Sequence, residues 1–326
     1  MAATAAPGRG AHDLPGGWPA IAAATAHEAQ ARLPFFIAHG GRAQHAGSVA
    51  RAHLGALAGW PDALRLDDAA VTLTLPAPER TAFFEQANRA LHAAGLITGW
   101  RNETYPVLAL DDGPALDDDT AQALDDSPAQ PQPPPPLASI ERAAARFWGT
   151  LTFGAHCNGW VAGADGRPAA LWIARRSFTK PTDPGQLDNL IGGGVPLGQS
   201  PAETVVREGW EEAGLTPAQM AGLQPGRRFG VLRDVPEGLQ RELISVFDLV
   251  LPPGLVPHNQ DGEVHSLALL PVAEALAHAA AGDMTVDAAL VTLDFALRHR
   301  LLAAGLYAAL QARAAALWRG PARLEP

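Results

Sequence analysis

Apolar and polar positions fall into two blocks of helix and strand signals, with a polar stretch between them. In the first block, Val71–Leu75 alternates as VTLTL, which favours a strand. Pro78–Gly95 has apolar residues at helical spacing and predicts a helix. Ala-rich Ile21–Arg32 favours another helix, and Trp100–Leu110 a closing strand. Residues 19–110 are therefore expected to form a small α/β domain, preceded by a flexible N-terminus at residues 1–18.

The polar stretch covers residues 111–137. Its first part holds seven aspartates and its second part is rich in proline, ending in the run Pro133–Pro136. Like charges repel, and proline cannot donate to a β-ladder. Because almost nothing in this stretch could be buried, it is expected to be an extended linker.

The second block, residues 138–318, alternates strand-like runs with helices. A short helix is expected at Ile140–Arg146 and longer ones at Val272–Ala281 and Val286–Trp318. The strands are expected at Trp160–Gly163, Ala170–Arg175, Phe229–Asp234, Leu243–Leu251 and Val264–Leu270. This alternation indicates the α/β class for the second domain.

Composition narrows the functional classes. The chain is 47% hydrophobic and 18% charged, so it can bury a core, and its net charge of −10 argues against a nucleic-acid or anionic-membrane binder. A single cysteine excludes an intrachain disulfide, and the N-terminal residues lack the apolar core of a signal peptide. We expect a cytoplasmic protein that acts on a small molecule and contacts neither nucleic acid nor membrane; a homodimer is compatible with the sequence.

The most informative stretch is Gly193–Leu215, GGVPLGQSPAETVVREGWEEAGL. Ser200 as N-cap and Glu203 three residues later make a capping box, and Pro201 suits the first helical position. Gly214 suits a left-handed C-terminal cap. These signals predict a helix over 201–213, with Val205, Val206, Gly209, Trp210 and Ala213 on its buried side.

Three carboxylates share one face of that helix. Glu208 precedes Glu211 and Glu212 by three and four residues, and such pairs are neighbours on a helix surface. Unpaired, they would repel and raise one another's pKa, and Arg207 cannot neutralise all three. The spacing alone is compatible with a solvated acidic face, or with a site for a hard cation such as Mg²⁺ or Mn²⁺.

The surrounding pattern favours the metal site, because it resembles the Nudix box. Six of the seven positions with a fixed identity match: Gly193, Arg207, Glu208, Glu211, Glu212 and Gly214. Leu215 also fits its aliphatic position. Gln199 stands where the pattern has Glu, and Gly209 stands where it has an aliphatic residue.

The likeness extends over most of residues 30–305. The chain resembles one Nudix subgroup, which is similar to the Nudix portion of fungal thiamine pyrophosphokinase fusions. In this subgroup an N-terminal domain of unassigned function precedes the Nudix domain. The segments that carry this likeness are 100–103, 140–142, 156–159, 171–176, 180–189 and 261–264. The acidic, Pro-rich linker is expected to be an insertion peculiar to this chain.

The resemblance implies a C-terminal Nudix α/β/α sandwich with a mixed sheet and metal-dependent hydrolysis of a diphosphate bond. Oxidised thiamine diphosphate analogues are the substrates that it suggests. Nucleoside-diphosphate-linked substrates, isoprenoid diphosphate isomerisation and a ligand-binding module without turnover stay open as alternatives. Cleavage of a diphosphate needs cations that neutralise the phosphates and activate water.

The predicted site follows from this chemistry. Glu208, Glu211, Glu212 and Arg207 are the predicted catalytic residues. The same three glutamates, with Gly192 through its backbone and with Glu263, are the predicted metal ligands, and Glu208 is either a ligand or the base. The residues expected to contact substrate are Lys180, Arg175, Arg176, Asp188 and Asn189. Each has an alternative role in an ordinary ion pair, a cap or a turn.

Overall fold

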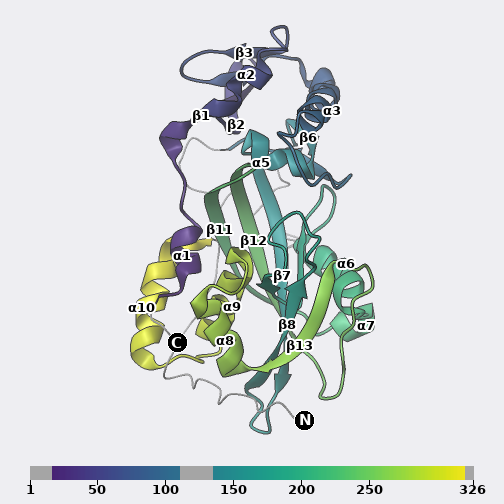
Figure 1. Cartoon of the computed structure of the whole chain (residues 1–326), viewed down its shortest axis with the longest axis vertical. Coiled ribbons are helices and arrows are strands. Elements are labelled where there is room, and N and C mark those ends of the chain that lie inside the picture. The colour runs from purple at the N-terminus through teal and green to yellow at the C-terminus, as the bar shows by residue number, and fades with distance from the viewer. Residues whose placement is uncertain (1–16, 111–134, 320–326) are drawn as a thin grey trace.

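The computed structural model describes residues 17–110 and 135–319 and arranges them as two units, one above the other along the long axis of the molecule (Figure 1). The predicted linker, apart from residues 135–137, lies outside the described residues. None of the helices within the described ranges is both long and apolar enough to cross a membrane.

The N-terminal unit is built on a four-stranded sheet with the order β2-β1-β4-β3. Its elements are β1 (Arg32–His39), β2 (Arg42–Ala50), α2 (Leu54–Leu57), β3 (Leu64–Leu66), β4 (Val71–Leu73) and α3 (Ala77–Ala93). β4 and α3 confirm the predicted strand and helix. Phe83, Phe84 and Leu91 of α3 are buried, and so is the polar Asn88, whereas Ala90 is exposed.

The N-terminal unit also takes in residues beyond the predicted linker. β5 (Thr104–Val107) pairs with β6 (Ala138–Glu141), and α5 (Ala145–Trp148) follows. Ile140–Arg146 is therefore not the predicted helix but a strand followed by short helical turns. Phe147 and Trp148 of α5 are fully buried in the N-terminal core, where the Trp148 ring packs 4.9 Å from that of Phe35. The packing thus moves the boundary from residue 138 to near residue 149.

The C-terminal unit contains a mixed sheet with the order β13-β8-β7-β12-β11-β14. Its strands are β7 (Leu151–Ala162), β8 (Pro168–Arg176), β9 (Leu187–Asp188), β10 (Ile191–Gly194), β11 (Gln224–Val235), β12 (Gly238–Val250), β13 (Val264–Pro271) and β14 (Trp318–Arg319). β7 and β12 run parallel, while the other neighbours are antiparallel. β10 adds to β7 beside the main sheet and leads into the signature helix.

Helices cover both faces of this sheet, which confirms the expected α/β/α sandwich (Figure 1). One face carries α6 (Pro201–Ala213) and α7 (Pro217–Met220), and the other carries α8 (Val272–Ala281), α9 (Val286–Arg298) and α10 (Ala304–Ala314). α8 matches its prediction. The expected single helix over 286–318 is interrupted after α9, because Arg300 adopts a left-handed backbone with φ of 52°.

The first described residues pack on the C-terminal unit. Trp18 is fully buried, and its indole N–H donates a 2.9 Å hydrogen bond to the Ala289 carbonyl of α9. α1 (Pro19–Ala23) lies against α9 in the same core. Trp18 is thus fixed in the core, although the sequence places it in a flexible terminus. The prediction of a helix over Ile21–Arg32 is wrong for most of its length, since α1 ends at Ala23 and β1 begins at Arg32.

Candidate active site

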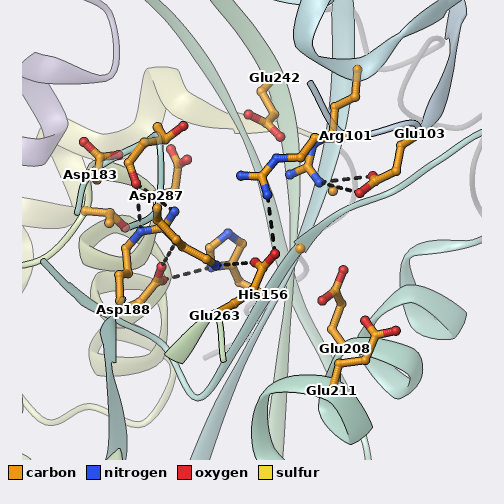
Figure 2. A pocket seen from close by; sticks show the side chains of 18 of the residues that line it. Arg101, Glu103, His156, Asp183, Asp188, Glu208, Glu211, Glu242, Glu263 and Asp287 are labelled. Atoms are coloured by element: carbon orange, nitrogen blue, oxygen red, sulfur yellow. Dashed lines mark hydrogen bonds and ion pairs between the residues drawn. The ribbon is translucent and has the colours of Figure 1, made fainter. Parts of the chain in front are cut away.

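A polar cavity of about 160 Å³ lies where α6, β10 and the N-terminal unit meet (Figure 2). Most of its walls are charged. Its acidic lining residues are Glu103, Asp183, Asp188, Glu208, Glu211, Glu242, Asp261, Glu263 and Asp287, and its cationic ones are Arg101, Arg142, Arg146, Arg176, Lys180 and Arg207. Carboxylates therefore outnumber cations in a pocket that has almost no apolar lining.

α6 brings the signature carboxylates to this cavity, and its ends are fixed as predicted. Ser200 and Glu203 form the capping box, with the Glu203 backbone N–H donating to the Ser200 hydroxyl at 3.3 Å. Gly214 takes the left-handed conformation, with φ of 64°. Val205 and Ala213 are buried, whereas Trp210 is half exposed and Thr204 is buried in its place. The apolar stripe is thus narrower than predicted.

Glu208 lies against the glycines of β10. A Cβ atom on Gly193 would stand 2.2 Å from Glu208 Oε1, so only glycine leaves room for the carboxylate there. Arg207 Nη2 donates to Glu208 Oε1 at 2.8 Å, and Arg207 Nη1 donates to Glu211 Oε2 at 2.7 Å. Burial nevertheless raises the pKa of Glu208 to about 7, because desolvation outweighs the nearby arginine.

Glu212 is more deeply buried, just behind the cavity wall. Its Oε2 accepts a 2.9 Å hydrogen bond from the Gly192 N–H, and its Oε1 lies 3.5 Å from Lys180 Nζ. Lys180 also pairs with Glu263 at 2.7 Å. Burial raises the pKa of Glu212 to about 8 in spite of Lys180. One lysine thus serves two carboxylates, one of which has lost nearly all contact with water.

These ion pairs determine whether the carboxylates of the cluster can bind a metal ion. No group of three or more His, Cys, Asp or Glu side chains in the described parts of the chain is poised to hold a metal as the side chains lie. Arg207 draws Glu208 and Glu211 to itself, and Lys180 sits between Glu212 and Glu263. The donor set, all oxygen and rich in carboxylate, still fits Mg²⁺ or Mn²⁺, provided that these two cations move aside.

The segment that contains β10 and α6 is similar to that of known proteins. A family profile described as the NUDIX domain matches residues 156–290, which include β10, α6 and Glu263. Residues 156–290 form a Nudix domain. The Arabidopsis thaliana proteins named Nudix hydrolase 24, chloroplastic, and Nudix hydrolase 20, chloroplastic, are each 36% identical, over 226 and 231 residues.

Those alignments cover 69% and 70% of this chain but 55% and 56% of the relatives, so the chain spans about half the length of the curated relatives it matches. Among solved structures, the NUDIX domain of Shewanella oneidensis NrtR complexed with ADP ribose is 14% identical. That likeness covers 47% of this chain and 89% of the other at a TM-score of 0.35. It is too slight to bear on function.

Of the other residues predicted to contact substrate, some line the cavity and others lie elsewhere in the Nudix domain. Arg176 lines the cavity and is tied to Asp188 at 2.8 Å. Arg175, one residue earlier on β8, instead donates to the Gly185 carbonyl at 2.7 Å and does not line the cavity. Asn189 is buried and bonded to Asn158 and His156. Arg175 and Asn189 thus lie outside the cavity lining, and their contact with substrate stays a prediction.

Several cavity residues were not predicted, and they come from three places. Arg101, Glu103 and Arg142 belong to the N-terminal unit, in segments that carry the subgroup likeness but had no role assigned to them. Glu242 lies on β12 and Asp287 in the first turn of α9. The sequence could have pointed to Asp287, because it is a lone carboxylate in the otherwise apolar start of α9. It could not have singled out Glu242, which is one of several charged residues in its stretch of the chain.

Gly209, the second departure from the signature, has a packing role. A Cβ atom there would lie 2.9 Å from the Met220 methyl group of α7 and 3.2 Å from Ile191 Cδ1 of β10. α7 therefore packs closer to α6 than an aliphatic residue at this position would allow.

Gln199, which stands where the Nudix pattern has Glu, contacts Arg207, the residue that pairs with Glu208 and Glu211. Its Oε1 accepts hydrogen bonds from Thr204 Oγ1 at 3.2 Å and Arg207 Nε at 3.4 Å. Gln199→Glu should attract the Arg207 guanidinium and loosen its hold on Glu208 and Glu211. We expect the Mg²⁺ concentration that gives a half-maximal rate to fall severalfold. Equal midpoints in a Mg²⁺ titration of both proteins would contradict this reading of Gln199.

The two raised pKa values predict a pH-dependent stability for the metal-free Nudix domain. Glu208 and Glu212 hold their protons more tightly when folded than when unfolded, where both titrate near 4.5. Their contribution to the free energy of unfolding is complete below that value and is lost as pH rises through about 7 and 8. Melting temperatures in EDTA should therefore fall from pH 6 to pH 9.

The variant that tests this dependence is Glu212→Gln, which cannot ionise. Its melting temperature should fall less over the same pH range and should exceed that of the unchanged protein at pH 9. Mg²⁺ should stabilise the unchanged protein more at pH 9 than at pH 6, because metal binding displaces the protons. A variant with the same pH profile as the unchanged protein would show that Glu212 is already ionised at pH 6.

Proposed function

We propose that the protein is a divalent-metal-dependent hydrolase that cleaves the diphosphate bond of a small molecule and releases a monophosphate. One observation carries this proposal. Glu208, Glu211 and Glu212 lie together beside the glycine-rich β10. Glu212 is buried and Glu208 half-buried, and burial raises both pKa values by more than Lys180 and Arg207 lower them. The relatives named Nudix hydrolases support the reaction class.

The residues that would hold the cation are the three glutamates, with the backbone at Gly192 and the carboxylate of Glu263 beside them. Bound there, Mg²⁺ or Mn²⁺ would neutralise the diphosphate and lower the pKa of the attacking water. Glu208 is within reach of such a water as a base, and a pKa of about 7 suits that task.

Lys180 and Arg207 have a second task in this proposal. Both are held by carboxylates in the structure, at 2.7 Å for Lys180 with Glu263 and 2.7 Å for Arg207 with Glu211. A cation that takes over those carboxylates frees the two side chains for the phosphate oxygens of the substrate. Arg176 stays paired with Asp188 and would orient the loop instead. Substrate and metal are then expected to bind cooperatively.

For the substrate we propose a thiamine diphosphate analogue, such as an oxidised form, on the strength of the subgroup resemblance. The experiment is product analysis with Mg²⁺ and a panel of thiamine diphosphate analogues, ADP-ribose, NADH and isopentenyl diphosphate. Release of a monophosphate from the thiamine analogues alone supports the proposal. Turnover of ADP-ribose or NADH favours a nucleotide hydrolase, an isomerised isoprenoid product favours that alternative, and binding without products would refute hydrolysis.

A further inference from the structure

A second cavity, of about 80 Å³, lies between the two units next to the catalytic pocket. Three of its lining residues are arginines of the N-terminal unit: Arg101 before β5, Arg142 after β6 and Arg146 in α5. The C-terminal unit closes it with Pro181 and Thr182, which follow Lys180, and with Glu237 between β11 and β12. The same three arginines line the catalytic pocket, so the two cavities share a wall.

The charge of this second cavity differs from that of the catalytic pocket. Three guanidinium groups face a single carboxylate, that of Glu237. Two of the three are loosely paired: Arg101 with Glu263 and Arg146 with Glu237, each at 3.4 Å, with about a quarter of each arginine side chain exposed. Such long pairs leave guanidinium N–H groups able to donate to an incoming anion, and arginine binds phosphate oxygens in a bidentate manner.

An independent observation comes from Tyr105 of β5. Its side chain is 1% exposed, yet its hydroxyl finds no hydrogen-bond partner among the described residues, which is unusual for a buried polar group. The hydroxyl lies against Gly194, where a Cβ atom would come within 1.8 Å of it, and Arg142 lies over the Tyr105 ring at 5.8 Å. A buried donor thus stands unsatisfied beside the same arginines.

A third small cavity continues from this tyrosine. It is lined by Tyr105, Arg142 and Arg146, and also by Thr150, whose buried hydroxyl likewise lacks a partner within the described ranges. Arg142 and Arg146 therefore stand at the junction of all three cavities. The polar groups that line the second and third cavities are mostly arginines and hydroxyl donors, against the two carboxylates of Glu237 and Glu242. Such a set suits a compact oxyanion better than a sugar or an apolar ring.

We propose that the N-terminal unit supplies a phosphate-binding subsite to the Nudix domain, formed in the second cavity by Arg101, Arg142 and Arg146, with the Tyr105 hydroxyl beside Arg142 in the adjoining third cavity. The ligand is a phosphate group, either one carried by the substrate away from the bond that is cleaved or a free phosphate that regulates the enzyme. Binding at this subsite requires neither metal nor turnover, so it stands apart from the proposed reaction.

The experiment titrates inorganic phosphate into the metal-free, full-length protein in EDTA and follows binding by calorimetry and by the melting temperature. The variants are Arg101→Gln, Arg146→Gln and Tyr105→Phe, each of which leaves the half-buried Arg142–Glu103 pair in place. Arg167→Gln is the matched control, because Arg167 is exposed in the turn between β7 and β8, away from the three cavities. We expect affinity to fall about tenfold or more in both arginine variants, less in Tyr105→Phe, and not in the control.

Two results would overturn the proposal. One is the absence of phosphate binding by the unchanged protein at millimolar concentration. The other is unchanged binding in Arg101→Gln and Arg146→Gln together with its loss in Arg176→Gln, which would place the phosphate beside Asp188. Because the readout is the phosphate-dependent change, a variant that is merely less stable does not imitate the expected result.

Kinetics with a substrate that is turned over then separate the two sources of the phosphate. Competitive inhibition by inorganic phosphate, with KM raised and kcat kept in Arg146→Gln, assigns the subsite to the substrate. A phosphate effect on kcat at saturating substrate, lost in the same variant, assigns it to a free regulator. Both patterns support the subsite, and a phosphate effect that is identical in the variant and the unchanged protein counts against it.

Discussion

Glu212→Gln is expected to lower kcat at saturating Mg²⁺ by about two to three orders of magnitude, the range that the loss of one charge-stabilising group costs an enzyme. The physical reason is the loss of a full negative charge from the proposed metal site, at a residue that is 5% exposed and so has no water to replace it. The hydrogen bond from Gly192 can be kept, because the amide oxygen of Gln accepts it equally well. Initial rates of product release measure the effect.

The controls for this variant separate chemistry from folding. Glu85→Gln removes the same charge from the exposed side of α3 and should leave the rate unchanged. The melting temperature of Glu212→Gln at pH 8 should not fall, because the variant removes a carboxylate that is costly to ionise. Turnover close to that of the unchanged protein would remove Glu212 from the metal site and would leave the proposed mechanism without its buried ligand.

Gly193→Ala is expected to lower turnover at least tenfold with little change in the melting temperature. A methyl group at this position would overlap the Glu208 carboxylate, with distances of 2.2 Å to Oε1 and 2.4 Å to Cδ. The backbone of Gly193 has no positive φ, so alanine is not strained there, and the flexible Glu208 side chain moves away instead. The fold is kept, whereas the carboxylate leaves the position from which it would act.

Gly222→Ala is the matched control for this variant, since a Cβ atom at Gly222 meets nothing within 4 Å. Its rate and melting temperature should equal those of the unchanged protein. Should Gly193→Ala instead unfold the protein while Gly222→Ala does not, the glycine would be required for the packing of β10 and not for the placement of Glu208. A rate that Gly193→Ala leaves intact would show that Glu208 works from another position.

The sequence predicted α6 and α8 to the residue, because their signals are local. Ser200, Pro201 and Glu203 start α6 through bonds within one turn, and Gly214 ends it. β1 and β2 were missed because their signals are weak or contrary. Pro34 lies within β1, and the strand tolerates it because β4 pairs only with Phe35–Ile37. The structure around such a strand, and not its own pattern, decides that it forms.

The residues of the candidate site also fall into those that the sequence could predict and those that it could not. The glutamates of α6 could be read from their spacing, because one helix carries all three. The cavity wall formed by Arg101, Glu103 and Arg142 could not, because those residues reach the site only through the packing of β5 and β6 on the other unit. Arg175 shows the converse. Arg175 and Arg176 are consecutive on β8 and so point to opposite faces of the strand, but alternation does not tell which of the two lines the cavity.

The burial of Trp18 constrains the order in which the chain folds. Its partner, the Ala289 carbonyl, is 271 residues away, so this contact closes nearly the whole described chain into one loop. The whole N-terminal unit precedes α9 in the sequence and can form early during synthesis, but α1 cannot pack until α9 has been made. The Nudix core is therefore complete only when the first described residues return to it. A Nudix domain expressed without the segment around Trp18 would lack the residue that fills this part of its core.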